Sequence, residues 1–254
     1  MKVRCFYALA AFAVIAVRSV SAESADDWVA KARAFLGPER ALNAVQSLHF
    51  EGTIDTTERV PDPADPGKAI DRPIRLTLDI VFQKPMQQRQ ILRSDKVERT
   101  STLDSYDAWE RVTDLTGKTP SRLTLLDPAG IKRLRATTTE NLSFYSNAES
   151  RQLRLLGDAS VDGLACVKLS FAHASGIVFL RYFEKSTGRL VKTEIENGGE
   201  IREEGQMVVS GIRFPRKVIN RTAGGKDTTI SFDRVTVNEP FPAEAFAVPS
   251  LQAK

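Results

Sequence analysis

Two stretches of the chain alternate between apolar and polar residues, a period typical of a β-strand with one buried face. The first covers residues 47–55 and the second covers residues 75–82. Side chains alternate across a strand, so each stretch is predicted to turn one row of residues toward the core. The rows predicted to be buried are Leu48, Phe50, Gly52 and Ile54 in the first stretch and Leu76, Leu78, Ile80 and Phe82 in the second. Polar residues such as His49 and Thr77 occupy the opposite faces.

Strand-like segments continue along most of the chain after these two stretches. They cover residues 86–94, 96–103, 108–114, 164–172, 176–183, 189–196, 206–210, 214–221 and 228–237, with a further one beginning near Leu153. Turn-forming sequences separate several of them, for example at residues 186–188 and 223–226. Short turns of this kind favour hairpins, so the pattern predicts about ten or eleven antiparallel strands.

Three segments depart from the strand period. Residues 26–35 carry apolar residues at helical spacing, and Gly37 ends this helix before a second short one that reaches about Val45. Residues 127–151 are also predicted to be largely helical, because a capping aspartate and a first-turn proline open the segment. Residues 58–71 are rich in proline and are predicted to form a polar loop.

The order of these elements limits the fold. Strands and helices do not alternate as they do in parallel βαβ units. The predicted class is mainly β with helical inserts (α+β), built as a single large curved antiparallel sheet or an unclosed β-barrel with a helical lid. Removing 22 signal residues from 254 leaves 232, which is enough for one core, so residues 23–254 are predicted to be one domain.

The N-terminus has the features of a cleavable signal peptide. A short basic start is followed by an apolar run over residues 6–17 and by small residues at positions 20–22. The apolar run is too short to cross a bilayer, which requires about 20 residues. Residues 1–22 are therefore predicted to be removed, which releases a soluble protein beginning at Glu23 into the periplasm. An uncleaved anchor is the alternative, because Arg18 interrupts the segment close to the cleavage site.

Removal of the signal peptide also changes the charge of the chain. The full sequence has 36 basic and 32 acidic residues, and the basic count falls to 33 once Lys2, Arg4 and Arg18 are lost. A balance this even gives no reason to expect a nucleic-acid partner. Cys166 is then the one remaining cysteine, so an internal disulfide is excluded, and its apolar neighbours predict a buried, unreactive thiol.

Sequence signatures of catalysis and of cofactor binding are missing. His49 and His173 are the two histidines, and neither lies at the spacing of a zinc-ligand pair. The sequence has no G-x-S-x-G elbow, and residues 224–228 are predicted to form a hairpin tip and not a phosphate-binding loop. Carboxylates such as Glu203 are explained by exposed strand faces. We therefore predict no catalytic residue, no metal and no cofactor.

Six segments occur in an order that is characteristic of one family. They are residues 41–52, Lys84-Pro85, residues 103–109, residues 186–191, residues 209–215 and residues 237–249. The first leads from a helix into a strand, the second places a basic residue before proline, and the third is a turn leading into tryptophan. The last three are hairpins that end in an apolar plug. Together they resemble the LolA-like and LolB-like superfamily of periplasmic lipoprotein carriers, over most of the chain after the signal peptide.

The resemblance implies an unclosed barrel that binds hydrophobic ligands under a helical lid, without a cofactor or catalysis. Lipid or lipoprotein acyl chains are the implied ligands, and membrane-associated donor or acceptor proteins are further partners in lipoprotein sorting and outer membrane biogenesis. The residues predicted to line the apolar cavity are Leu48, Phe50, Ile54, Leu76, Leu78, Ile80, Phe82, Ile91 and Trp109. The lipoprotein carrier has an arginine before the proline that latches its lid. Here Lys84 is the latch candidate, although lysine lacks the planar fork of arginine.

Three functions remain open from the sequence. The preferred one is a periplasmic carrier or chaperone that shelters a lipid, an acyl chain or a lipoprotein. The second is a non-enzymatic interaction or sensor module that engages a partner protein through the sheet surface, and the third is a hydrolase with an unrecognised site. Uptake of an acyl ligand would favour the first function, and a large side chain at Gly52 is predicted to narrow the pocket and abolish that uptake.

Overall fold

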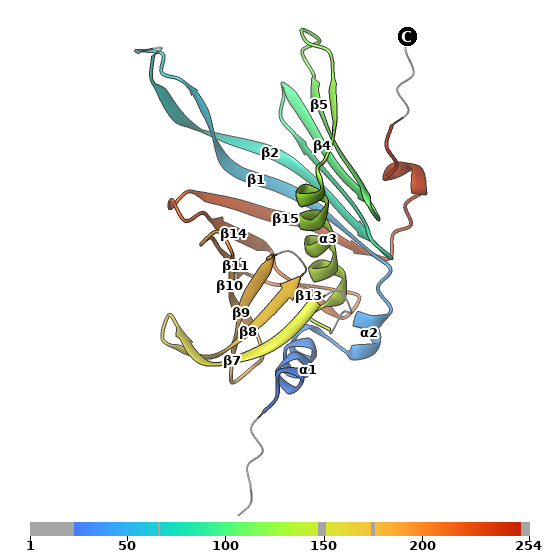
Figure 1. Cartoon of the computed structure of the whole chain (residues 1–254), viewed down its shortest axis with the longest axis vertical. Coiled ribbons are helices and arrows are strands. Elements are labelled where there is room, and N and C mark those ends of the chain that lie inside the picture. Colours follow the sequence, from blue (N-terminus) through green and yellow to red (C-terminus); the bar gives the residue numbers. More distant parts are fainter. Residues whose placement is uncertain (1–22, 66, 147–150, 174–175, 250–254) are drawn as a thin grey trace, which may run out of the picture.

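The computed structural model describes residues 23–65, 67–146, 151–173 and 176–249, which are coloured in Figure 1. The predicted signal peptide, residues 1–22, lies outside the described residues. Among the helices that are described, none combines the length and the apolar character that a membrane-spanning helix requires.

The chain forms a long series of strands with helices at its start and in its middle. The helices are α1 (Ala25–Leu36), α2 (Glu39–Asn43) and α3 (Pro128–Ser143), and a 3-10 turn, η1 (Ala243–Ala245), lies near the C-terminus. The strands before α3 are β1 (Ser47–Pro61), β2 (Ala69–Gln83), β3 (Gln87–Arg93), β4 (Val97–Asp104), β5 (Asp107–Asp114) and β6 (Arg122–Leu125). The strands after α3 are β7 (Arg151–Val161), β8 (Leu164–His173), β9 (Val178–Glu184), β10 (Leu190–Ile195), β11 (Glu200–Glu204), β12 (Met207–Val209), β13 (Ile212–Phe214), β14 (Lys217–Arg221) and β15 (Asp227–Val237).

Thirteen of these strands form one antiparallel sheet in the order β6-β5-β4-β3-β2-β1-β15-β14-β11-β10-β9-β8-β7. Most neighbours are consecutive in sequence, but β1 pairs with β15 and so joins the two ends of the chain. Strands β12 and β13 form a separate two-stranded sheet between β11 and β14 in the sequence. The edge strands β6 and β7 do not pair with each other, so the barrel is unclosed, and the predicted fold class is confirmed.

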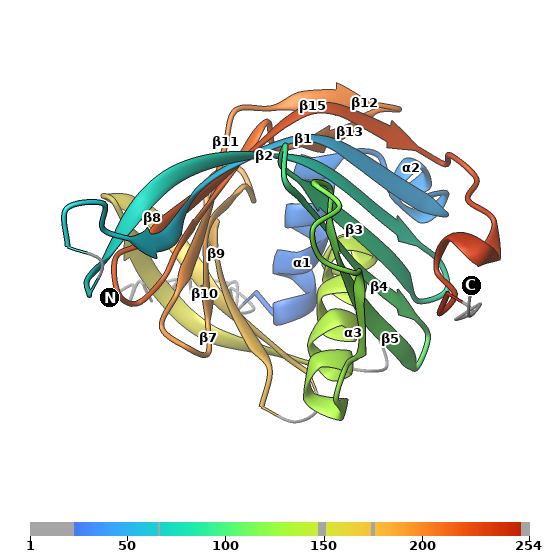
Figure 2. The ribbon, with the colours of Figure 1, turned by 90° about the horizontal axis from the view of Figure 1, so that it is seen from above.

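The sheet curves strongly, and helices α1 and α3 lie on its concave side (Figure 2). Two apolar clusters fill the space between the helices and the sheet. In one cluster Trp28 of α1 packs with Phe171 of β8 and Phe183 of β9. In the other, Leu42 of α2 packs with Leu48 of β1. Burial of these side chains on the concave face is what holds the helices against the sheet.

Local sequence signals set the ends of the helices. Ser24 caps α1, because its hydroxyl accepts the backbone N–H of Asp27 while the Asp27 carboxylate accepts the N–H of Ser24. Asp127 caps α3 in a similar way through the N–H of Gly130. Helix α3 ends where Phe144 takes a left-handed backbone conformation, so it is shorter than the predicted helix over residues 127–151.

Three details of the predicted elements are wrong. The loop predicted over residues 58–71 is mostly strand, because β1 and β2 remain paired as far as Pro61 and Ala69. Strand β3 pairs with β2 no further than Thr77, so β2 has only β1 as a neighbour at Pro73. Proline is tolerated at such an edge position. The short strands β6, β11 and β13 were not expected, and the main sheet has thirteen strands where about ten or eleven were predicted.

Candidate functional site

The apolar rows of β1 and β2 share the concave face, as their alternation predicts. Leu48 lies opposite Phe82, and Phe50 lies opposite Ile80. Side chains directly opposite each other on antiparallel strands point to the same side of the sheet. All four belong to or pack against the apolar cluster that holds α2, so this side is the one that faces the helices.

A hollow of about 340 Å³ lies on the concave face between the sheet and the helices. Four residues predicted to line a cavity do line it: Leu48, Phe50, Ile80 and Phe82. The other apolar residues around the hollow are Leu36, Phe144, Tyr145, Phe179, Ile201, Phe214, Pro215, Val218, Ile230 and Phe232. Within the main sheet, the apolar lining comes from strands between β2 and β9 in the sheet order, and it reaches the end of α3.

Three more of the predicted residues lie on the concave face but not in the wall of this hollow. They are Ile54, Leu76 and Leu78, of which Ile54 and Leu78 are buried. Gly52 lies opposite Leu78 on the same face, but a Cβ at this position would come within 1.9 Å of the carbonyl oxygen of Ser231. Gly52 is therefore required by the close approach of β15, and a larger side chain there would disrupt the sheet instead of narrowing a pocket.

Ile91 and Trp109 lie on the convex face, so the prediction that they line the cavity is wrong. Ile91 is directly opposite Asp79, and the register places Trp109 in the same cross-strand row as Arg89. The Trp109 indole Nε1 donates to the carbonyl of Phe246, with a distance of 3.2 Å. The C-terminal segment thus covers the convex face here, and the apolar character of Trp109 reflects burial under that segment.

The side-chain ammonium of Lys84, the predicted latch, makes no hydrogen bond or ion pair within the described part of the chain, and only its backbone N–H is bonded, to the carbonyl of Gln46. Burial lowers the pKa of Lys84, and the nearby charge of Arg33 lowers it further. Arg33 of α1 instead contacts the end of α3, because it donates to the carbonyls of Ser143 and Phe144 at 2.8 Å each. It also donates to both carboxylate oxygens of Glu39, the first residue of α2. The residue that ties the three helices together is therefore Arg33.

A polar set of residues occupies the part of the hollow formed by the second half of the sheet. Arg181, Thr193, Glu203 and Asn220 come from β9, β10, β11 and β14, and all four line the hollow. The sequence analysis placed Glu203 on an exposed strand face. In the structure Glu203 is half-buried and lines the hollow. The hollow thus has an apolar wall on β1 and β2 and a more polar wall on β9 to β14.

Glu140 of α3 is held between the two strands β8 and β9. Its Oε1 lies 2.7 Å from Nε2 of His173, and its Oε2 accepts a hydrogen bond from Arg181. The Arg181 guanidinium also lies 4.8 Å from the ring centroid of Tyr145 and 4.9 Å from that of Phe171. The side chains of Glu140 and Arg181 are almost completely buried. The attraction between their opposite charges therefore offsets the unfavourable removal of each charge from water.

Burial affects two groups of this polar wall. Nε of Arg181 is buried and has no hydrogen-bond partner among the described residues. Burial raises the pKa of the Glu203 carboxyl, and the charge of Arg181 offsets only part of that effect. The raised pKa means that the neutral form of Glu203 is favoured relative to a carboxyl in water.

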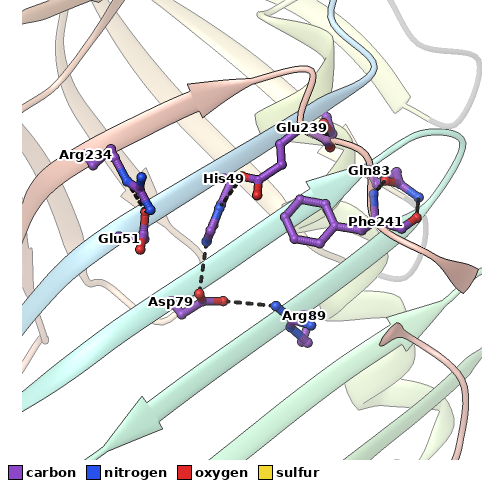
Figure 3. A network of polar contacts seen from close by, with 9 residues as sticks. His49, Glu51, Asp79, Gln83, Arg89, Arg234, Glu239 and Phe241 are labelled. Carbon is purple, nitrogen blue, oxygen red and sulfur yellow. Dashed lines mark hydrogen bonds and ion pairs between the residues drawn. The ribbon is translucent and has the colours of Figure 1, made fainter. Parts of the chain in front are cut away.

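A second polar network lies on the convex face, around His49 (Figure 3). Nε2 of His49 is 2.9 Å from Oδ2 of Asp79, and Nδ1 is 2.7 Å from Oε2 of Glu239 in the C-terminal segment. The ring of Phe241 meets the imidazole edge to face at 5.3 Å. Gln83 also bonds the backbone of Phe241 through both its amide oxygen and its amide nitrogen. The network attaches the C-terminal segment to β1 and β2.

Two carboxylates on one imidazole favour its protonated form. Burial alone would lower the pKa of His49, but the hydrogen bonds that the imidazole makes to the Asp79 and Glu239 carboxylates outweigh burial and raise the pKa above its ordinary value. His49, Glu51 and Asp79 could together offer three ligand atoms to a metal ion. Each carboxylate, however, is already paired with an arginine, Glu51 with Arg234 and Asp79 with Arg89.

Sequence reasoning missed the buried cluster of Glu140, His173 and Arg181. These residues come from one helix and two strands, and Glu140 lies 41 residues before Arg181 in the chain. The sequence of β9 did contain one indication of this cluster: Arg181 falls in the same alternating row as Phe179 and Phe183. A charged residue within an apolar row indicates a buried partner.

An unclosed, strongly curved antiparallel sheet with helices on its concave face is the architecture of the LolA-like proteins, and two solved structures show the likeness. A LolA superfamily protein from Nitrosomonas europaea matches 89% of this chain and 99% of its own, with a TM-score of 0.59 and 14% sequence identity. A DUF1329 family protein from Desulfovibrio piger matches 91% of this chain and 100% of its own, with a TM-score of 0.55 and 12% identity.

No family model matches the sequence, and no curated protein matches it either. At these low identities the structural likeness establishes the fold and nothing further. The chain has the LolA-like fold, and the resemblance predicted from the order of its sequence segments is confirmed at that level.

Proposed function

We propose that the protein is a periplasmic carrier or chaperone that shelters an acyl chain or a similar hydrophobic ligand in the concave hollow. The observation that supports this most is the apolar wall formed by Leu48, Phe50, Ile80 and Phe82, which faces the helices across a space of about 340 Å³. Burying hydrocarbon against such a wall contributes about 0.8 kcal/mol per methylene. The proposed activity is binding and release, without catalysis.

The size of the hollow limits the ligand. Small-molecule sites commonly measure about 300–1,000 Å³, and a hollow of about 340 Å³ lies near the lower end of that range. This volume favours one small amphiphile or a single acyl chain. A lipoprotein with several acyl chains would require the helices to move away from the sheet, and Arg33 is the contact that would have to break.

The proposed location rests on the N-terminal signal sequence and on the likeness of the fold to a LolA superfamily protein. Residues 1–22 combine a basic start, an apolar run and small residues before Glu23. Export to the periplasm would place the carrier between two membranes, where an exposed acyl chain in water is unfavourable.

A second candidate function, an interaction module, is favoured by the edge strand β7. Leu155 and Leu156 of this strand are 39% and 52% exposed, and one side of β7 pairs with no other strand among the described residues. Unpaired edges with apolar side chains can accept a further strand from a partner protein. This function would use the edge of the sheet and would not require the hollow.

The carrier proposal can be tested with an uncharged fluorescent acyl probe and two matched variants. Val218 lines the hollow, whereas Ile219 is the next residue on β14 and points to the other side of the sheet. Val218→Trp should fill the hollow and weaken saturable uptake by about tenfold or more, and Ile219→Trp should leave the uptake unchanged. Circular dichroism checks that both variants fold. Equal uptake by both folded variants, or no saturable uptake by the wild type, would contradict the proposal.

A further inference from the structure

The proposed binding of a hydrocarbon chain leaves the polar wall of the hollow unexplained. Arg181 lies directly opposite Thr193, Thr193 lies opposite Ile201, and Ile201 lies opposite Asn220. These residues form a row across β9, β10, β11 and β14. Glu203 is two residues beyond Ile201 on the same face. Polar side chains in a concave apolar site usually fix the orientation of a ligand.

Residues of both charge types line the hollow. The charged residues in its lining are two arginines and two glutamates: Arg181, Arg213, Glu140 and Glu203. Glu140 and Arg181 already pair with each other. An anionic head group beside Arg181 would also approach Glu140 and Glu203, and a cationic head group beside Glu203 would also approach Arg181. A head group of either sign that contacts the buried pair therefore also meets a like charge, Glu140 for an anion and Arg181 for a cation.

The hydrogen-bonding groups of the wall are mixed in the same way. Nε of Arg181 is a buried donor without a partner among the described residues. The carboxyl of Glu203 accepts hydrogen bonds, and the side chains of Thr193 and Asn220 both donate and accept. A hydroxyl group also donates and accepts, so it can satisfy an arginine and a carboxyl at the same time without adding charge. Leaving such groups unpaired in a buried site is unfavourable.

On these grounds we propose, building on the carrier function, that the ligand is an uncharged amphiphile with a hydroxylated head. The head would lie against Arg181, Thr193, Glu203 and Asn220, and the hydrocarbon tail would lie against the apolar wall of β1 and β2. Acylglycerols and alkyl glycosides share this chemistry. The polar wall would then select the head group, while the apolar wall supplies most of the affinity.

The test is competition against the uncharged fluorescent probe by five amphiphiles that share a twelve-carbon chain. Two carry hydroxylated heads, monododecanoylglycerol and dodecyl glucoside. The other three are methyl dodecanoate, dodecanoate and dodecyltrimethylammonium, all used below the concentration at which they form micelles. At least one hydroxylated ligand should bind about tenfold or more tighter than the other three, and the tighter of the two identifies the glyceride or the glycoside as the head.

A pair of variants separates head-group recognition from binding of the chain. Asn220→Leu should reduce the ratio of hydroxylated-ligand affinity to methyl-ester affinity by about tenfold. Thr229→Val is the control, because Thr229 lies opposite Ile219 on the other face of the sheet and should leave the ratio unchanged. These substitutions leave the buried pair of Glu140 and Arg181 intact, and circular dichroism checks that both variants fold.

The possible failures are distinguishable. If methyl dodecanoate competes as well as the hydroxylated ligands, or a charged ligand competes best, the inference about the head group is wrong while the carrier function stands. An unchanged affinity ratio in folded Asn220→Leu would also overturn it. If none of the five displaces the probe, the carrier function fails and this inference fails with it.

Discussion

Arg33 joins the three helices, and its replacement tests how the concave side is held together. The guanidinium donates to the carbonyls of Ser143 and Phe144 at the end of α3, to the carboxylate of Glu39 and to the amide oxygen of Asn43. Arg33 itself is only 5% exposed. Arg33→Met would keep most of the buried methylene stem and remove all of these hydrogen bonds.

The loss of stability expected for Arg33→Met follows from the number and kind of hydrogen bonds that Arg33 makes. A hydrogen bond to a charged group contributes about 1.5–3 kcal/mol, and the two carbonyl acceptors are at good distance. Because such contributions are not fully additive, we expect Arg33→Met to lower the free energy of unfolding by about 3–5 kcal/mol. Arg33→Lys should cost less, since an ammonium can reach one carbonyl but cannot present two parallel donors.

Urea unfolding followed by circular dichroism measures this cost. Arg40→Met is the matched control, because Arg40 is exposed on α2 and its replacement should change the unfolding free energy by no more than about 0.5 kcal/mol. Hydrogen exchange should also show faster opening of the last turn of α3 in Arg33→Met. Equal unfolding midpoints for Arg33→Met and Arg40→Met would refute the assignment of Arg33 as the contact that holds the helices.

Two further predictions concern the sheet and its convex face. Leu78 is 3% exposed on the concave face, whereas the adjacent Thr77 is exposed. Leu78→Asp should therefore destabilise the protein by roughly 3 kcal/mol or more, while Thr77→Asp should be nearly neutral. Equal melting temperatures for the two variants would mean that Leu78 does not face the core. The pKa of His49 is raised above its ordinary value of 6.5, so its ion pairs contribute fully below pH 6.5 and the contribution is lost as the pH rises through the raised pKa. The wild type should accordingly lose stability relative to His49→Gln over that rise, and an NMR titration that gave His49 a pKa at or below 6.5 would contradict the assignment.

The alternating pattern predicted the faces of β1 and β2 because one face of these strands is apolar and the other carries charges such as Asp79. The same reasoning failed for Trp109. Both faces of the sheet are covered near β5, by α3 on one side and by the C-terminal segment around Phe246 on the other. When both faces are buried, hydrophobicity no longer tells them apart, and only the register of the strands does.

The candidate site could be predicted only in part for a related reason. The apolar wall is local in sequence, since it comes largely from the adjacent strands β1 and β2. The polar wall depends on β11, whose sequence is mostly charged and gave no strand signal, and on the contact of Glu140 with Arg181 across the concave face. Pairing between distant segments is set by the folded topology, which local periodicity does not encode.

The central claim is that the concave hollow carries a ligand, and native mass spectrometry of the protein isolated from its own cells tests it most directly. The account predicts that the wild type and Ile219→Trp retain a small, uncharged, hydroxylated amphiphile, and that folded Val218→Trp lacks it, because Val218 lines the hollow and Ile219 does not. A wild-type protein that carries no such adduct and acquires none when offered monododecanoylglycerol or dodecyl glucoside would contradict the claim.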